Sequence, residues 1–363
     1  MAKVNVGIDL GTYNSAAAWS PLDEPRSDLL QSEAGATPQG ITFPSFVLFD
    51  AAGEPIAFGQ QARMRADMPL QLVWGFKRLL NCSYEAAKPQ LGRFLYRVVP
   101  DEKGRAAILV GGRQYLPQDI YRLFLEWMRS QILDSAVNPQ LAGHEWVSTV
   151  ISVPAYFDAA QDQLTLEAAR EAGLPDPRHC REPSAAAFAY GLETSMGEEE
   201  QTVMTIDLGA GTLDISVGAM IRDESGYPTF AELTRAVGDV ALGGIDIDDA
   251  LLEAVLEHQG LVALQDVRRA LTSTGYTGLT GNQQALYMEL DTLRGEVERR
   301  KIELSTRPVT QVFTPDGSEV TLARSREEYD AGDEAIYLDE VLGAKAEPSA
   351  APGAPFLARF RAH

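Results

Sequence analysis

One short turn occurs twice in this chain, and this repetition restricts the folds that the chain can adopt. Residues 7–15 read GIDLGTYNS, and residues 205–214 read TIDLGAGTLD. Each turn follows an apolar run and leads into another, which is the pattern of a β-hairpin closed by glycine. The sequence therefore predicts a duplicated architecture whose two halves contain the same hairpin.

The residues of these turns are suited to binding phosphate. Glycine lets a ligand approach the backbone closely, and the N–H groups of a tight turn form a concavity that attracts anions. Asp9 and Asp207 each end a strand just before the turn, and carboxylates beside a polyphosphate are ligands that Mg²⁺ prefers. For either turn alone an ordinary hairpin is the better interpretation. The duplication favours a phosphate clamp, and Gly243-Gly244 at a helix start offers a third anion site.

Composition and charge exclude several classes of function. The net charge of −21 disfavours nucleic acid and anionic membrane surfaces as partners. The two cysteines, Cys82 and Cys180, provide neither a disulfide framework nor zinc-ligand spacing. We expect no signal peptide and no membrane span, and hence a cytoplasmic protein. A dinucleotide-binding motif is unsupported because Asp214 stands where its third glycine would be.

Three helices are predicted around the motifs. The first begins after Asp158 as its N-cap and stops at Gly173, and the second has Pro183 in its first turn and ends before Gly191. The third is a longer amphipathic helix over residues 283–304.

Six segments together resemble the nucleotide-binding domain of the heat-shock protein 70 (DnaK-type) chaperones. They are GIDLGTYNS, FKRLL, VISVPAYFDAAQDQ, REPSAAAFAYGLE, TIDLGAGTLDISV and LGGIDIDDALL. The resemblance runs from about residue 3 to residue 329, and it implies the α/β, actin-like (ribonuclease-H-like) ATPase fold of two lobes, each with an inserted subdomain. Lobe I would cover residues 1–191 with an insertion at about 41–116.

The second lobe is expected to be incomplete. It would cover residues 201–330 with an insertion at about 237–330, followed by an Ala/Pro-rich tail at 331–363 that we expect to be disordered. The closing segment of lobe II, the apolar linker and the peptide-binding domain of the family have no counterpart in the sequence. We therefore predict an unpaired strand edge at 202–208.

The resemblance also assigns roles to individual residues. Lys77, Glu182, Asp207 and Thr212 match the catalytic positions, and Asp9 and Asp207 match those that hold hydrated Mg²⁺. The positions expected to contact ATP or ADP are Gly11, Thr12, Tyr13, Gly209, Gly211, Gly243, Gly244, Glu298, Lys301 and Ser305. Pro154 and Arg178 match a relay proline and an arginine that docks a J-domain co-chaperone. A nucleotide-exchange factor is a second expected partner.

Four positions depart from the family pattern. Tyr13 stands in place of threonine and Ile302 in place of the arginine that stacks on adenine, while Asp162 and Leu166 replace basic residues. The leading hypothesis is a Mg-ATP-binding and hydrolysing chaperone ATPase domain without a peptide-binding domain. A degenerate, non-catalytic scaffold is the alternative, and a sugar kinase on the same fold is disfavoured because no sugar pocket is indicated.

Overall fold

The chain divides into two units, each built around its own elements. The computed structural model describes residues 1–24, 26–32, 41–64, 71–94, 96–193, 200–222, 228–234, 236–239, 242–274 and 279–343. The first unit comprises Met1–Pro89 and Phe94–Asp239, and the second comprises Gln90–Arg93 and Val240–His363.

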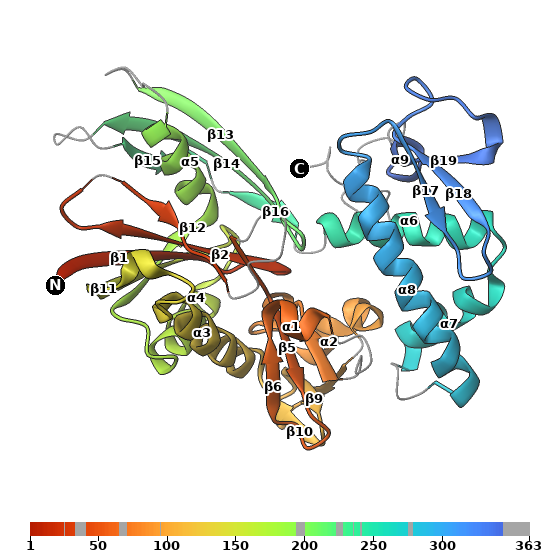
Figure 1. Cartoon of the computed structure of the whole chain (residues 1–363), viewed down its shortest axis with the longest axis horizontal. Coiled ribbons are helices and arrows are strands. Elements are labelled where there is room, and N and C mark those ends of the chain that lie inside the picture. The colour runs from red at the N-terminus through yellow and green to blue at the C-terminus, as the bar shows by residue number, and fades with distance from the viewer. Residues whose placement is uncertain are drawn as a thin grey trace. The chain divides into compact units, whose positions relative to one another are not determined.

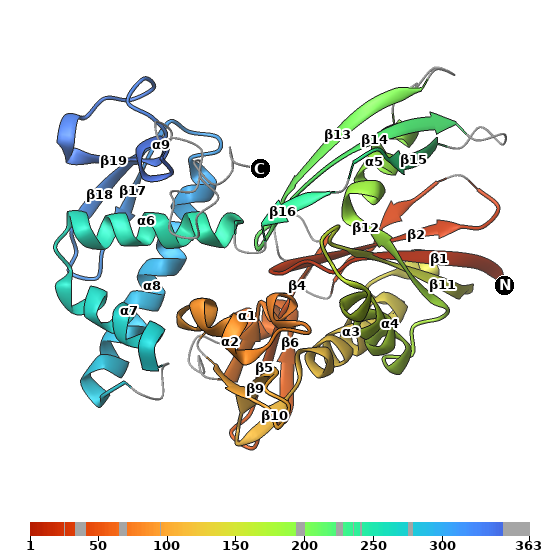
Figure 2. The same ribbon diagram turned by 180° about the vertical axis from the view of Figure 1, so that it is seen from behind.

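The first repeated hairpin lies at the centre of a six-stranded mixed sheet (Figure 1). Strand β1 pairs antiparallel with β2 and parallel with β11, and the order is β12-β11-β1-β2-β3 with β4 also paired to β2. The bounds are β1 Ala2–Asp9, β2 Asn14–Pro21, β3 Asp28–Leu29, β4 Thr42–Pro44, β11 His144–Val153 and β12 Pro177–Arg181. Helices α3 (Pro117–Leu133) and α4 (Ala159–Glu171) lie along this sheet (Figures 1 and 2).

The second hairpin belongs to a four-stranded sheet with the same connectivity. Its order is β13-β14-β15 with β16 paired to β14, so β13 to β16 repeat the arrangement of β1 to β4. The bounds are β13 Gln201–Leu208, β14 Leu213–Arg222, β15 Pro228–Glu232 and β16 Val237–Asp239. Within the described residues β13 has a neighbour on one side only, which confirms the predicted open edge.

The insertion between β4 and α3 contains two small antiparallel sheets, β6-β5-β7 and β10-β9-β8. Their bounds are β5 Phe46–Phe49, β6 Pro55–Phe58, β7 Leu72–Trp74, β8 Arg97–Pro100, β9 Ala106–Val110 and β10 Arg113–Tyr115, with the short helices α1 (Gly59–Arg63) and α2 (Tyr84–Ala87). A 3₁₀ turn, Phe76–Leu79, follows β7 and carries Lys77.

The predicted helix boundaries can be compared with the structure. Helix α4 starts after Asp158, whose side chain accepts a hydrogen bond from the Gln161 amide at 2.8 Å, as predicted. Helix α5 spans Glu182–Glu193, so the expected end before Gly191 is wrong. Gly191 is tolerated inside this Ala-rich helix at a cost of about 1 kcal/mol relative to alanine. None of the described helices combines the length and the apolarity that a bilayer span requires.

Helix α5 packs against the sheet that contains the second hairpin. Ala187 of α5 packs against Met220 of β14 in one hydrophobic cluster, and Val203 and Phe230 lie against it. The unit boundary accordingly falls after Asp239.

The second unit is mainly helical and ends in a small sheet. Its helices are α6 (Gly244–His258), α7 (Val262–Thr274) and α8 (Gly281–Glu303), and its sheet order is β17-β18-β19. Strands β17 (Val309–Phe313) and β18 (Glu319–Ala323) form a hairpin. The Leu290, Leu293 and Val297 side chains of α8 are buried, as the amphipathic pattern predicted.

Part of the segment expected to be a disordered tail is ordered. Strand β19 (Ala335–Tyr337) pairs parallel with β18, and the four-residue helix α9 (Leu338–Val341) follows it. Tyr337 is 1% exposed, and its hydroxyl donates to the Gly332 carbonyl at 3.0 Å. The three buried apolar residues of β19 explain the difference, because they complete a local core. The rest of that prediction, residues 344–363, lies outside the described residues.

Asp162, one of the departures from the family pattern, takes part in a structural ion pair. Its two carboxylate oxygens accept hydrogen bonds from Arg181 at 2.9 and 2.7 Å. The same guanidinium donates to the Pro154 carbonyl at 3.1 Å. Arg181 therefore ties the end of β12 both to α4 and to the loop containing Pro154.

We expect Asp162→Ala to lower the free energy of unfolding by about 1.5–3 kcal/mol, because Arg181 then loses a charge-assisted, bidentate partner. The Asp162 side chain is 11% exposed. Urea unfolding measures this effect. The matched control is Glu126→Ala, which removes the exposed partner of Arg122 and should change stability by less than about 1 kcal/mol. Equal effects of the two substitutions would contradict a structural role for the Asp162 pair.

Candidate functional site

A cavity of about 170 Å³ in the first unit collects most of the predicted site residues. Those that line it are Asp9, Gly11, Thr12, Tyr13, Lys77, Glu182, Asp207, Gly209, Gly211 and Thr212. They come from the two repeated turns, the 3₁₀ turn after β7 and the first residue of α5. Residues that are far apart in the sequence are thus brought to one place by the fold.

The two glycine turns touch each other at this cavity. A Cβ atom on Gly211 would lie 2.6 Å from the Thr12 hydroxyl oxygen, so only glycine allows the turns to approach this closely. The first turn is braced by Ser45, whose hydroxyl donates to the Gly11 carbonyl at 2.8 Å. The second is braced by Arg78, whose guanidinium donates to the Gly211 carbonyl. Neither Ser45 nor Arg78 was among the predicted site residues.

Lys77 and Glu182 form a buried ion pair beside the turns. The Lys77 ammonium nitrogen lies 2.6 Å from a Glu182 carboxylate oxygen, and the two side chains are only 6% and 10% exposed. Lys77 is held there because its neighbours Phe76 and Leu79 are buried, with the Phe76 ring against Tyr121. Glu182 opens α5, where a carboxylate is favoured by the helix dipole.

The charge state of the pair follows from its surroundings. Burial by itself lowers the pKa of Lys77, but the negative charges of Glu182 and Asp9 outweigh it and hold that pKa above its usual value. Burial raises the pKa of Glu182, and Lys77 opposes this effect. The ammonium therefore stays charged within a group of carboxylates, where it can attract an anionic ligand.

Asp9 and Asp207 face the cavity from equivalent positions in the two hairpins. The Ser152 hydroxyl donates to Asp9 at 2.8 Å. The pKa of Asp207 is raised by burial and then by the negative charge of Asp9, so a cation between these carboxylates would relieve their repulsion. The described residues contain no cluster of three or more His, Cys, Asp or Glu side chains able to hold a metal. Because the two hairpins contribute one carboxylate each, Asp9 and Asp207 fit a cation that takes its other ligands from water and phosphate oxygens.

Asp214 is a buried carboxylate next to the cavity residue Asp207, and it was not among the predicted site residues. It lies directly opposite Asp207 in the β13–β14 pairing. It is 1% exposed, and neither of its carboxylate oxygens makes a hydrogen bond of normal geometry within the described residues. Burial, followed by the charges of Glu182 and Asp207, raises its pKa to about 7. The hairpin pattern predicts this position, because a two-residue turn at Ala210 and Gly211 places Asp214 opposite Asp207.

The raised pKa of Asp214 makes stability depend on pH. Its folded-state pKa of about 7 exceeds the ordinary value of 3.8, so the folded state binds the proton more tightly. The stability from this group is fully present below about pH 3.8 and is lost as pH rises through about 7. Asp214→Asn should therefore unfold with a free energy larger than wild type by on the order of 2 kcal/mol at pH 8, with little difference near pH 4.

Urea unfolding in a chelating buffer at several pH values tests this prediction. The matched control is Asp266→Asn, which changes a carboxylate that is 60% exposed and should leave the pH profile unchanged. Parallel profiles for wild type and Asp214→Asn would show that Asp214 ionises normally in the folded protein.

Tyr13 turns its ring toward the insertion. It packs edge-on against Phe46 and Trp74, with ring centroids 5.0 and 5.9 Å apart. The Arg63 guanidinium lies 4.8 Å from the centre of the Tyr13 ring. The aromatic residue that replaces threonine is thereby anchored in a hydrophobic cluster, although it still contributes to the cavity lining.

The remaining predicted residues lie in the second unit. Gly243 precedes α6, and its amide donates to Asp246 at 2.8 Å. Lys301 of α8 lies 2.7 Å from an Asp248 carboxylate oxygen and donates to the Gly244 carbonyl at 3.0 Å. Lys301 and Gly244 are thus brought together by α6 and α8.

Ser305 follows the end of α8, and both it and Ile302 are exposed. Ser305 donates to the Ile302 carbonyl at 2.6 Å, and the Ile302 side chain is 59% exposed. Glu298 lies three residues before Lys301 on the same helix and is partly exposed. Desolvation raises the pKa of Asp248 to about 6, with Lys301 acting in the opposite direction.

Comparison with known protein families agrees with this geometry. A family model described as Hsp70 protein matches residues 5–330 of the chain. The match confirms the predicted family, and with it the α/β, actin-like ATPase fold with its duplicated hairpin.

Proposed function

The chain belongs to the Hsp70 family, and we propose that its Hsp70-like nucleotide-binding domain binds Mg-ATP and hydrolyses the γ-phosphate bond. The observation that carries the proposal is the buried Lys77–Glu182 pair, which shares one cavity with both glycine turns and with Asp9 and Asp207. A cavity with a buried ammonium, backbone amides and flanking carboxylates is suited to a polyphosphate with its cation.

In the proposed mechanism each side chain has one task. The turn amides and the hydroxyls of Thr12 and Thr212 bind the phosphates, while the Lys77 ammonium attracts the γ-phosphate and neutralises developing charge. Glu182 orients the attacking water by accepting a hydrogen bond from it. Asp9 and Asp207 would hold hydrated Mg²⁺, which supplies charge neutralisation and orients the phosphates when bound. The low exposure of Lys77 and Glu182 strengthens these electrostatic effects.

We further propose that the domain acts with partners of the chaperone system. Arg178, the residue expected to dock a J-domain co-chaperone, is 73% exposed and makes a surface ion pair with Asp176, so it is accessible. A nucleotide-exchange factor and a cytoplasmic location stay predictions from the sequence.

Nucleotide titration tests the proposal. We expect ATP and GTP to bind with similar, weak affinities, because the phosphate-binding residues are assembled in the cavity, whereas Ile302 cannot provide the cation–π contact of an arginine. The missing contact alone is worth about 0.5–2 kcal/mol. Isothermal titration calorimetry with ATP, GTP and inorganic phosphate, with and without Mg²⁺, measures both affinity and cation dependence. Tight and adenine-selective binding would contradict this expectation, and no binding of any nucleotide would overturn the proposed function.

A non-catalytic scaffold is the second candidate, and it is favoured by the Asp162–Arg181 pair. In the family a basic surface is expected at Asp162, whereas here the carboxylate holds the Pro154 loop in place through Arg181. Steady-state ATP turnover separates the two candidates. Nucleotide binding without Mg²⁺-dependent release of phosphate would favour the scaffold.

A further inference from the structure

Strand β13 and the matching strand of the first hairpin, β1, differ in how exposed their apolar side chains are. Aligning the two IDLG turns pairs Val6, Ile8 and Leu10 with Met204, Ile206 and Leu208. The first three side chains are 0%, 2% and 2% exposed, and the second three are 61%, 48% and 44% exposed. The same strand of the repeat is therefore a core strand in one sheet and a solvent-exposed edge in the other.

The two strands also differ in their neighbours within the sheet. In the first sheet β1 is covered along its second edge by β11, which pairs in parallel from Ala2↔His144 to Asp9↔Ser152. Strand β12 extends the same sheet beyond β11, and helix α4 lies between these two strands in the chain. No described residue provides the equivalent of β11 beside β13.

The backbone of β13 is arranged to accept such a neighbour. The Gly209 amide donates to the Thr212 carbonyl at 2.9 Å, so residues 209 and 212 form a hydrogen-bonded pair. In an antiparallel ladder, hydrogen-bonded pairs alternate with pairs that are not hydrogen-bonded. Leu208, Ile206 and Met204 fall at the second kind of position, so their N–H and C=O groups point away from β14. Within the described part of the chain, these groups form a row of donors and acceptors that no neighbouring strand pairs with.

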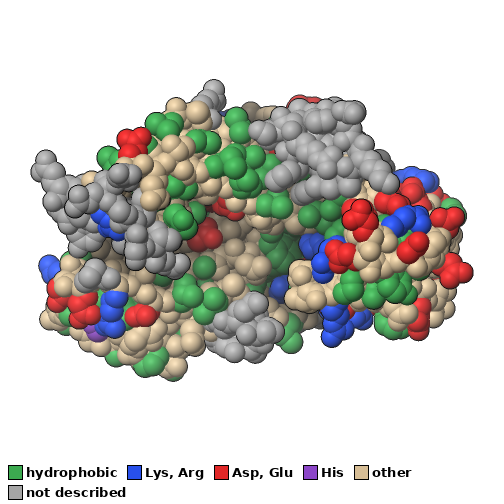
Figure 3. Space-filling view, turned by 90° about the horizontal axis from the view of Figure 1, so that it is seen from above, with side chains coloured by type: hydrophobic (Ala, Val, Ile, Leu, Met, Phe, Trp, Pro, Cys, Tyr) green, Lys and Arg blue, Asp and Glu red, His purple; other side chains and the backbone are tan. Residues whose placement is uncertain are grey.

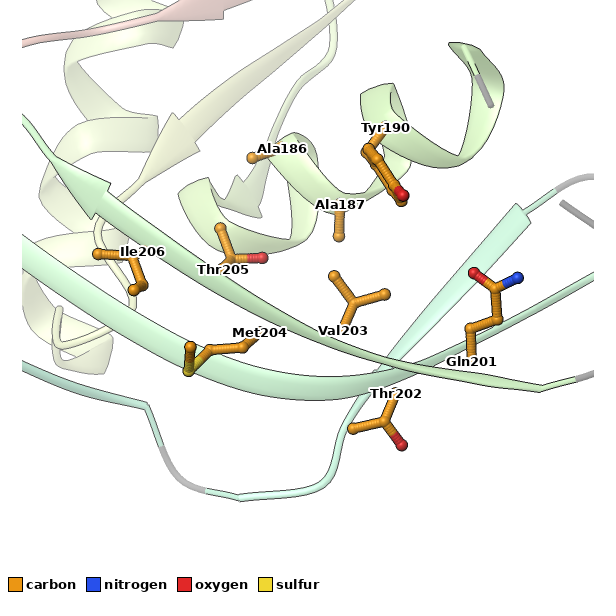
Figure 4. Close-up of a pocket in the computed structure, with 9 residues that line it drawn as sticks. All are labelled: Ala186, Ala187, Tyr190, Gln201, Thr202, Val203, Met204, Thr205 and Ile206. Atoms are coloured by element: carbon orange, nitrogen blue, oxygen red, sulfur yellow. The ribbon is translucent and has the colours of Figure 1, made fainter. Parts of the chain in front are cut away.

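A groove lies between this strand and α5. It has a volume of about 500 Å³ and is lined by Ala186, Ala187 and Tyr190 of α5 together with residues 201–206 of β13 (Figure 4). Val203 and Thr205 point toward the helix, and Thr202 points to the opposite side (Figure 4). None of the described residues that line the groove carries a charged side chain. Seen from above, hydrophobic side chains also gather over the β13 sheet (Figure 3).

The charges of the sheet indicate what kind of strand would bind. Besides Asp207 at the cavity and the buried Asp214, its described strands carry Glu232 and Asp239, with Arg222 as their basic residue. The whole chain has a net charge of −21. A partner segment with an apolar centre and basic ends would complement both the uncharged groove and the acidic surroundings.

We propose that the β13 edge is a binding site for a β-strand of a partner polypeptide, added parallel to β13 as β11 is added to β1. The partner strand has apolar side chains at its centre and basic residues at its ends. Its main chain forms hydrogen bonds with the outward-facing N–H and C=O groups of Met204, Ile206 and Leu208, and its apolar residues occupy the groove beside α5. This mode of binding is the addition of a strand to a sheet edge.

The test uses the full chain and a fluorescent synthetic peptide that copies residues 144–153 with two lysines added at each end. Fluorescence anisotropy should show saturable binding. The same peptide with glutamates in place of the added lysines should bind at least about fivefold more weakly, because its ends are repelled. Absence of saturable binding by the lysine peptide, or equal binding of the two peptides, would overturn the proposal as stated.

Variants of Met204 separate main-chain from side-chain effects. Met204→Pro removes an outward-facing donor without removing a bond to β14 and should weaken the peptide by about tenfold or more. Met204→Val keeps that donor and should change binding by less than about threefold. If Met204→Pro disturbs the fold, the same test uses wild-type protein and two peptides, one N-methylated at the odd positions and one at the even positions. Only one set of amides faces β13, so one of the two peptides must lose binding. Binding unaffected in both peptides would contradict strand addition.

Two further measurements determine the direction of the added strand and the identity of the chain that occupies the β13 edge. A photoreactive group at the peptide N-terminus should label the chain near Gln201 if pairing is parallel, and labelling near Leu208 would overturn the parallel arrangement. Sedimentation of the chain alone identifies a second copy as the occupant if it forms a dimer that Met204→Pro dissociates. That result would refute the partner strand while leaving the proposed nucleotide site untouched.

Discussion

Replacing Lys77 by alanine is expected to lower ATP turnover by about 10²–10³-fold or more while ADP binding changes little. In the proposed mechanism the ammonium acts at the γ-phosphate, which ADP lacks. Its loss would remove an interaction made during hydrolysis rather than in the product complex. Turnover is measured by phosphate release and ADP affinity by calorimetry. The matched control is Lys88→Ala, which removes a lysine that is 52% exposed and paired with Glu85.

The same substitution should also destabilise the fold. Glu182 would lose its partner while it remains buried near Asp9 and Asp207, and an unpaired buried charge costs about 3–5 kcal/mol. Lys77→Ala combined with Glu182→Gln should recover much of this stability without recovering turnover. Equal turnover in wild type and Lys77→Ala would rule out the catalytic role of Lys77.

Gly211→Val is expected to reduce both nucleotide affinity and turnover by about 10²-fold, because it separates the two turns that form the cavity. Its Cβ would approach three atoms of the Thr12 side chain at 2.6, 2.7 and 2.8 Å. The turns must then move apart by several tenths of an ångström or more, and the phosphate-binding groups move with them.

A second glycine of the same repeat provides the control for this prediction. Gly7 lies in β1, and a Cβ on it would meet no atom within 4 Å. Gly7→Ala should therefore bind ATP as the wild type does. Circular dichroism and urea unfolding establish that both variants are folded. Wild-type affinity in Gly211→Val would show that contact between the turns is not needed for binding.

The features that could be predicted from the sequence are those in which local chemistry and topology agree. The IDLG turns define two hairpins, and their glycines, carboxylates and threonines follow directly from that pattern. Lys77 and Glu182 contact each other across 105 residues of sequence, and no periodicity indicates such a contact. They were found only through the family resemblance.

Other features depend on tertiary contacts that no local pattern records. Arg181 binds Asp162 because β12 and α4 lie side by side. Asp214 is buried in β14 opposite Asp207 of the neighbouring strand, and β19 is ordered because Tyr337 fills a local core. The helix end at Gly191 was misplaced because tertiary packing overrides a single glycine.

The separation of Lys77 and Glu182 in the sequence has a consequence for how the domain emerges from the ribosome. The two residues are 105 positions apart, so at roughly 5–20 residues per second Glu182 is synthesised about 5–20 s after Lys77. During that interval the lysine has no buried carboxylate to pair with, and its segment must stay in water. Thr212, the last residue of the cavity, follows later still. The nucleotide site is therefore the part of this unit that nascent chains complete late, and added nucleotide can assist folding only after both hairpins have left the exit tunnel.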